Sequence, residues 1–258
     1  MKITVLVENT SSRADCEAEH GLSLYIETGD RHILFDMGQS DLFSKNAEKL
    51  GVNLENVDMA VLSHGHYDHG GGLKRFLEVN AKASVYINQY AFEPHYNGVE
   101  KYIGLDKTLE NNSRFVYVGD ALQIDKGLAL YSCNDREQKY HMGSFGLNME
   151  QDGVLVPDDF RHEQYLLIEE NGKRVLISGC SHKGIMDIVD WFRPDVLVGG
   201  FHFSKLPLDD TLKGYAEYLD SFHTEYYTCH CTGTEQYKYM RQYITKLQYI
   251  SVGQMITI

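Results

Sequence analysis

The hydrophobic residues of this chain recur with two periods, one typical of strands and one typical of helices. Alternating apolar and polar residues, or a short continuous apolar run, predict β-strands. Such segments cover residues 2–8, 22–28, 32–36, 57–62, 84–88, 114–118, 128–132, 164–169, 174–178, 195–199, 224–228, 248–252 and 254–258. A helical period predicts helices over residues 41–50, 73–79, 184–192, 209–221 and 234–246.

Turn signals connect these segments. Gly29-Asp30 and Asn171-Gly172 each predict a tight hairpin between two strands. Ser40 is a candidate cap for the helix that follows it. The stretch from about 134 to 163 is polar with scattered apolar residues, which predicts a loop over another part of the molecule.

The order of the predicted elements indicates the fold class. Hairpins occur in both halves of the chain, and each is followed by helix–strand units. This arrangement predicts an α/β protein in which two sheets face each other with helices outside, a four-layer αββα sandwich. No internal repeat and no proline-rich linker is visible, so we expect a single domain over residues 1–258.

Composition limits the classes of function. The chain has 37 acidic and 24 basic residues and a net charge of −13, which disfavours a nucleic-acid binder. No segment approaches the roughly 20 apolar residues of a membrane helix, and no secretory signal is visible. We therefore expect a cytoplasmic protein that acts on a small molecule without nucleic-acid or membrane partners, and we leave a homo-oligomer open. Five cysteines, an odd number, predict reduced thiols.

A histidine-rich segment carries the clearest chemical signal. Residues 63–72 read Ser-His-Gly-His-Tyr-Asp-His-Gly-Gly-Gly, directly after the predicted strand 57–62. Positions two apart lie on opposite sides of a helix, so we expect the ligands to come from a turn. Imidazole and carboxylate groups suit zinc, and also iron or manganese. The sequence therefore predicts a divalent metal site of one or two ions. Its first candidate ligands are His64, His66, Asp68 and His69.

The His-x-His-x-Asp-His pattern resembles the signature of the metallo-β-lactamase superfamily. Asp36, in Leu-Phe-Asp-Met-Gly, resembles the upstream Asp-x-Gly motif of that family. The resemblance implies the αββα sandwich and a metal site between its sheets. It implies that His64 and His66 hold a first metal, that Asp68 and His69 hold a second, and that Asp36 orients ligands. A bound water with its pKa lowered to about 7 would be the nucleophile.

Later motifs are similar to one branch of this superfamily, which includes the dihydropterin-type synthases of methanopterin biosynthesis. These motifs are Glu-His-Gly-Leu-Ser at 19–23, Gly-Cys-Ser-His at 179–182, Gly-Gly-Phe-His at 199–202, and Thr-Cys-His-Cys-Thr-Gly at 228–233.

The downstream ligands follow from the resemblance together with the predicted strand ends. We assign His182 as the third ligand of the first metal and His230 as a ligand of the second. His162 is the rival third histidine, but its acidic, polar neighbours predict a solvated loop, so we expect it to be dispensable for metal binding. Cys180 stands where relatives carry an aspartate and either bridges the metals or packs beside them. Cys229 and Cys231 would point away from His230 on an alternating strand, which predicts packing roles.

The leading hypothesis is a metal-dependent hydrolase in which an activated hydroxide attacks a small phosphorylated or pterin-like substrate. Asp68 would orient the water, and His202 would hydrogen-bond substrate oxygens or act as a general acid. A transferase of the dihydropterin-synthase type, a lactonase and a non-catalytic metal-dependent sensor are the alternatives.

Overall fold

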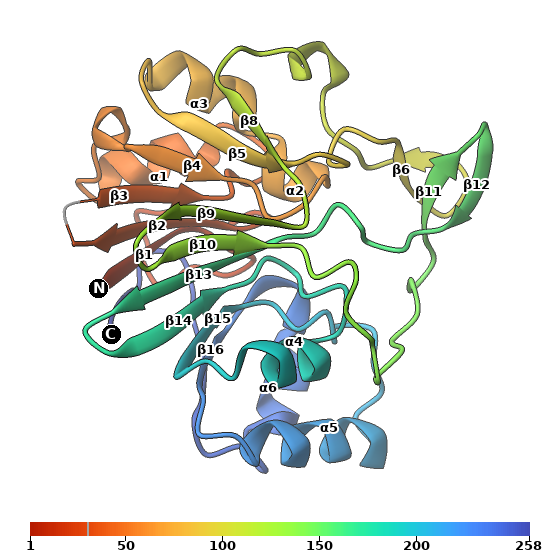
Figure 1. The fold of residues 1–258 in the computed structure, drawn as a ribbon. Coiled ribbons are helices and arrows are strands. Elements are labelled where there is room, and N and C mark those ends of the chain that lie inside the picture. Colours follow the sequence, from red (N-terminus) through yellow and green to blue (C-terminus); the bar gives the residue numbers. More distant parts are fainter. Residues whose placement is uncertain (30) are drawn as a thin grey trace.

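Two seven-stranded sheets face each other in the computed structural model, which describes residues 1–29 and 31–258, and helices cover their outer faces (Figure 1). The predicted αββα sandwich is therefore confirmed. The predicted Gly29-Asp30 turn includes Asp30, which lies outside the described residues. The strands on either side of it pair as antiparallel neighbours.

The first sheet has the order β18-β1-β2-β3-β4-β5-β8. These strands are β1 (Lys2–Val7), β2 (Ser23–Thr28), β3 (Arg31–Phe35), β4 (Met59–Val61), β5 (Ser84–Asn88), β8 (Phe115–Val118) and β18 (Met255–Thr257). The second sheet has the order β17-β16-β15-β14-β13-β10-β9. Its strands are β9 (Ala121–Asp125), β10 (Leu128–Tyr131), β13 (Tyr165–Glu170), β14 (Lys173–Ile177), β15 (Val196–Gly199), β16 (Glu225–Thr228) and β17 (Leu247–Tyr249). In each sheet, antiparallel hairpins lead into parallel strands.

Three apolar cores hold the four layers together. The central core lies between the sheets and joins residues such as Leu24 and Val198. Phe43 belongs to the core between the first sheet and its helices, and Leu212 to the core between the second sheet and its helices. The helices are α1 (Leu42–Lys49), α2 (Tyr67–Gly70), α3 (Leu73–Val79), α4 (Ile185–Phe192), α5 (Asp210–Asp220) and α6 (Thr234–Met240). Three short 3-10 turns cover Leu54–Asn56, Lys107–Leu109 and His230–Thr232.

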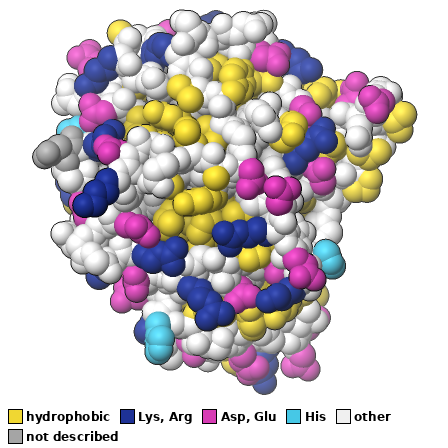
Figure 2. All heavy atoms as spheres, viewed as in Figure 1, with side chains coloured by type: hydrophobic (Ala, Val, Ile, Leu, Met, Phe, Trp, Pro, Cys, Tyr) yellow, Lys and Arg dark blue, Asp and Glu magenta, His cyan; other side chains and the backbone are white. Residues whose placement is uncertain are grey.

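A third, four-stranded sheet projects from the sandwich (Figure 1). It has the order β12-β11-β6-β7, with β6 (His95–Asn97), β7 (Lys101–Tyr102), β11 (Leu147–Gln151) and β12 (Val154–Pro157). Hydrophobic side chains lie on its projecting end (Figure 2), and Val99 and Val154 are among the exposed large apolar residues. This small sheet was not predicted, because strands of two to five residues with mixed exposure carry too little periodicity.

Two local predictions were wrong in detail. The helix expected over 234–246 ends at Met240. The cap expected at Ser40 lies at Asp41 instead, although Ser40 Oγ still accepts a hydrogen bond of 3.1 Å from the Leu42 backbone N–H. Among the described residues, no helix is long and apolar enough to cross a membrane.

Candidate metal centre

The histidine-rich segment follows β4 and lies at one edge of the sandwich, between its two sheets. His66 precedes the four-residue helix α2, which carries Asp68 and His69, so these two ligands come from a helical turn rather than an irregular one. His64, His66 and His69 are buried, and at most 4% of the surface of each residue is exposed. The close approach of the two halves of the chain requires Gly179, because a Cβ there would lie 2.2 Å from Ser63 Oγ.

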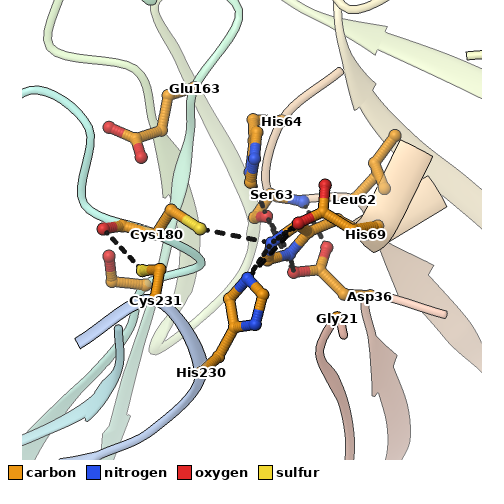
Figure 3. A network of polar contacts seen from close by, with 12 residues as sticks. Gly21, Asp36, Leu62, Ser63, His64, His69, Glu163, Cys180, His230 and Cys231 are labelled. Atoms are coloured by element: carbon orange, nitrogen blue, oxygen red, sulfur yellow. Dashed lines mark hydrogen bonds and ion pairs between the residues drawn. The ribbon is translucent and has the colours of Figure 1, made fainter. Parts of the chain in front are cut away.

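A buried carboxylate orients two of the histidines (Figure 3). Asp36 Oδ2 accepts hydrogen bonds from His69 Nδ1 at 2.6 Å and from the Ser63 hydroxyl at 2.7 Å. Since the Ser63 proton is used in this way, Ser63 Oγ accepts from His64 Nδ1 at 2.8 Å. Both rings therefore carry their proton on Nδ1, which leaves the Nε2 lone pairs free for a cation. Asp36 thus lies where a residue that orients metal ligands is needed.

Three donor groups lie within 4 Å of His69 Nε2, and with His69 we call them the cysteine subsite: Asp68, Cys180 and His230. His69 Nε2 lies 3.3 Å from both Cys180 Sγ and His230 Nε2. Asp68 Oδ2 lies 3.4 Å from His230 Nε2 and 3.9 Å from His69 Nε2. A tetrahedral ion with bonds of 2.0–2.1 Å separates its ligands by roughly 3.3–3.4 Å. The separations of His69 from Cys180 and His230, and of His230 from Asp68, are close to this value and fit a divalent cation, whereas Asp68 and His69 lie further apart.

The electrostatics of the cysteine subsite favour positive charge. Burial alone would lower the pKa of His69, but Asp36 and Asp68 raise it, so a metal ion there would have to displace a proton. Burial lowers the pKa of His230 to about 4, so its imidazole is neutral, as ligation requires. Burial alone would raise the pKa of Asp68, but the facing His69, His20 and His230 lower it well below its usual value. Burial raises the pKa of the Cys180 thiol well above its usual value, and a neighbouring dication would favour the thiolate instead.

A second group, the histidine subsite, consists of His64, His66 and His182. His64 Nε2, His66 Nε2 and both ring nitrogens of His182 are buried and have no hydrogen-bond partner. Each such nitrogen costs on the order of 1–3 kcal/mol unless something binds it. Burial lowers the pKa of His64 and of His182 well below the usual value, so both rings are neutral. The orphaned nitrogens of His64 and His182, together with one ring nitrogen of His66, fit a cation bound by imidazoles.

His162 is not in a solvated loop, and that expectation was wrong. Its side chain is fully buried, as are those of Asp158 and Glu163, because Phe160 packs inward between them. His162 Nδ1 accepts a hydrogen bond of 2.8 Å from the Gly65 backbone N–H. Burial lowers the pKa of His162 to about 3, so the neutral ring carries its proton on Nε2. That nitrogen faces Asp158 Oδ2 at 3.4 Å, which disfavours it as a metal ligand.

Glu163 fixes the loop that carries His182. Its Oε1 accepts from the His182 backbone N–H at 2.7 Å, and its Oε2 accepts from Tyr165 Oη at 2.6 Å. The His182 ring stacks on Phe160 with a centroid distance of 4.4 Å and an interplanar angle of 11°. Backbone and ring of His182 are therefore both held in place. No local pattern marks Glu163, because its partner His182 lies 19 residues further along the chain.

Other residues of the centre were also missed. His20 Nε2 lies 3.2 Å from Asp68 Oδ2, and the Glu-His-Gly motif around it was the only signal. Asn9 Oδ1 contacts His230 Nδ1 at 2.8 Å and had no signal. The strand-alternation argument for Cys231 was wrong, because β16 ends at Thr228 and residues His230–Thr232 form a 3-10 turn. Cys231 therefore lies beside Cys180 and His230, whereas Cys229 packs in the central core.

A cavity of about 590 Å³ opens onto both subsites. Asp68, Cys180, His182 and His230 line it together with His202, whose ring centroid lies 4.3 Å from that of His182. Burial lowers the pKa of His202 to about 3, so its ring is neutral. The small sheet and the segment after β15 contribute Lys101 and Lys205 to the same cavity. A hollow of about 620 Å³ elsewhere has no histidine or cysteine among its described lining residues.

Known proteins match most of this chain. The family model of the metallo-β-lactamase superfamily matches residues 17–221. An uncharacterised protein of Methanocaldococcus jannaschii is 32% identical over 99% of this chain and 100% of its own length. From the same organism, 7,8-dihydropterin-6-methyl-4-(β-D-ribofuranosyl)-aminobenzene-5′-phosphate synthase is 25% identical over 93% of this chain and 90% of its own length.

A solved structure shares the whole fold. The crystal structure of Tm1679, described as a metal-dependent hydrolase of the β-lactamase superfamily, superposes with a TM-score of 0.85 at 31% identity. The match covers 100% of this chain and 99% of that one.

Proposed function

Because the chain belongs to the metallo-β-lactamase superfamily, whose fold implies divalent metal binding, we propose that it is a metal-dependent hydrolase of a small phosphorylated or pterin-like substrate. The observation that carries this proposal is the cysteine subsite, whose donors have the spacing of a tetrahedral ion beside an open cavity. We propose zinc as the ion, because imidazole, carboxylate and thiolate ligands together suit it best, with iron or manganese as alternatives.

A bound divalent cation lowers the pKa of a coordinated water to about 7 and polarises substrate oxygens. The protein's own residues do the rest. Asp68 lies at the floor of the cavity as an ionised carboxylate, where it orients the attacking water as a hydrogen-bond acceptor. His202 is a neutral imidazole, so its N–H donates to the leaving oxygen rather than transferring a proton from an imidazolium.

The rim of the cavity supports an anionic substrate. The protein carries a net charge of −13, yet the cations lining this cavity are Lys101 and Lys205. A phosphate group on the substrate would neutralise them. Replacing either lysine by Ala should raise KM for a phosphorylated substrate by up to about tenfold and leave kcat nearly unchanged. Lys126→Ala is the matched control, because Lys126 lines the other hollow.

The proposal is tested by assaying the metal-free protein, reloaded with zinc, manganese or iron, on phosphomonoesters, phosphodiesters and lactones. We expect phosphoester hydrolysis that a chelator abolishes and added metal restores. Cleavage of lactones without any phosphoester hydrolysis would replace the proposal with a lactonase. The absence of turnover with every metal, despite bound ions, would favour a sensor.

The synthase relative favours a second candidate, a transferase that moves an organic group to an acceptor other than water. Turnover in ¹⁸O-labelled water separates the two. A hydrolase places the label in its product, whereas a transferase forms an unlabelled condensation product that requires the acceptor.

A further inference from the structure

A second buried carboxylate, that of Asp158, lies beside His66 of the histidine subsite. Asp158 Oδ2 lies 2.9 Å from His95 Nδ1, 3.4 Å from His162 Nε2 and 3.9 Å from His66 Nε2. The side chains of Asp158, His95 and His162 have no exposed surface. His95 begins β6 and Asp158 follows β12, so both come from the small sheet. A buried charge of this kind needs hydrogen bonds or a nearby cation.

Two arrangements would satisfy this cluster, and the hydrogen bonds decide between them. The four residues could themselves hold an ion, since their donor atoms lie within 4.8 Å of one another. However, Gly65 donates to His162 Nδ1, so His162 Nε2 carries a proton and faces the carboxylate. His95 donates its Nδ1 proton to Asp158. His95 is therefore the one histidine of the cluster that donates a hydrogen bond to Asp158 Oδ2, and the Phe160 backbone N–H donates to Oδ1. His162 Nε2 faces Oδ2 without a hydrogen bond. A carboxylate oxygen has two lone pairs, so Oδ2 keeps one acceptor position toward His66.

We propose that Asp158 is a positioning residue for the metal centre, which accepts a hydrogen bond from His66 Nε2 when His66 binds the first metal through Nδ1. This proposal rests on the proposed metal-dependent function and extends it. The present 3.9 Å between His66 Nε2 and Asp158 Oδ2 exceeds a hydrogen bond, so a small rotation of the His66 ring closes it on loading. An outer carboxylate of this kind fixes the tautomer of a ligating histidine and makes it more basic.

The small sheet would then help to hold a metal ligand. The sheet supplies cavity-lining residues such as Lys101 and Leu147, and through Asp158 it also holds a metal ligand. Substrate contacts on the sheet would therefore be transmitted to the His66 ring.

The test compares the zinc affinities of the full chain carrying Asp158→Asn or Asp159→Asn, measured by competition with a chromophoric chelator. Asp159 is the matched control because it is the adjacent carboxylate and is exposed. We expect Asp158→Asn to weaken zinc binding by about 10–100-fold and to shift the visible absorption bands of the cobalt-loaded protein. Asp159→Asn should change neither.

A double-variant comparison separates positioning from general destabilisation. If Asp158 acts through His66, adding Asp158→Asn to His66→Ala should cause no further loss of affinity at the cysteine subsite. Equal zinc affinity in the Asp158→Asn and wild-type proteins, or a loss that persists in the His66→Ala background, would overturn the proposal.

If the Asp158→Asn protein does not fold, His95→Gln tests the proposal instead, because this variant keeps the Asp158 carboxylate. The proposal expects the same number of zinc ions as in the wild type. The loss of one ion would show that the cluster itself binds metal, and the proposal would be wrong. A wild-type protein that binds no zinc, manganese or iron would instead contradict the proposed function.

Discussion

The cysteine subsite and the histidine subsite lie side by side but are held in different ways. In the cysteine subsite, His69 Nδ1 bonds Asp36 and His230 Nδ1 contacts Asn9, so each ring already points its Nε2 at the others. In the histidine subsite, His182 has no hydrogen bond on either ring nitrogen and relies on stacking against Phe160. The difference teaches that hydrogen bonds orient the His69 and His230 rings of the cysteine subsite, whereas in the histidine subsite they orient the His64 ring alone and stacking holds the His182 ring.

The largest effect is expected when a ligand of the histidine subsite is removed. His66→Ala should lose one metal ion and lower turnover by roughly 10³-fold, because a catalytic metal contributes several kcal/mol to the transition state. Metal analysis and steady-state kinetics check both. His223→Ala is the control, since His223 follows α5 and is exposed. Wild-type metal content in His66→Ala would show that His66 is not a ligand.

The next effect concerns the chemistry between the subsites. His202→Ala should keep its metal but lose about 10²-fold in turnover, because a hydrogen bond to the leaving oxygen is removed. Metal content and kcat, measured on the same preparation, check this prediction. Unchanged kcat in the variant would exclude the role of His202.

A smaller effect sharpens the claim that hydrogen bonds preorganise the cysteine subsite. Asp36→Asn should weaken metal binding by about 10–100-fold, because the amide nitrogen cannot accept. Asp36 uses both oxygens as acceptors: Oδ2 for His69 and the Ser63 hydroxyl, and Oδ1 for the Ser63 backbone N–H. Chelator competition measures the change, and the exposed Asp41→Asn serves as its control. An affinity equal to that of the control would mean that the Asp36 contacts do not matter for binding.

The smallest effect on metal content is expected when His162 is replaced. His162→Gln should retain the metal content of the wild type and lose about 1–3 kcal/mol of stability, because the hydrogen bond from Gly65 is disturbed. Metal analysis and denaturant unfolding separate the two quantities. A metal-loaded structure with His162 at the ordinary zinc–nitrogen distance of about 2.0–2.1 Å would contradict this assignment.

The sequence predicted what is encoded locally. The segment from His64 to His69 could be recognised because its donors lie within six residues. Most strands of the two large sheets were found because they carry short apolar or alternating runs, but β9, whose residues are exposed or half-buried, was not predicted. The paired hairpins were enough to predict the four layers. These features depend on neighbours in the chain, which a single sequence shows directly.

The remaining parts of the centre depend on contacts between distant residues. The segment 158–163 reads as polar, yet Asp158, Phe160 and His162 face inward while Asp159 is exposed. Charged residues at alternate positions hide that pattern, since burial of Asp158 is explained only by His95, 63 residues away. His95 itself stands in a short strand with no histidine nearby in the sequence.

The pairing of β18 with β1 has a consequence for how the protein folds. The last strand of the chain completes the edge of the sheet that the first strand began, and Met255 lies opposite Thr4. The cysteine subsite likewise combines Asp68 and His69 with Cys180 and His230. Contacts between such distant segments form late, because a long loop must close first. A nascent chain emerging from the ribosome would therefore be unable to retain its metal until nearly all of it had been synthesised.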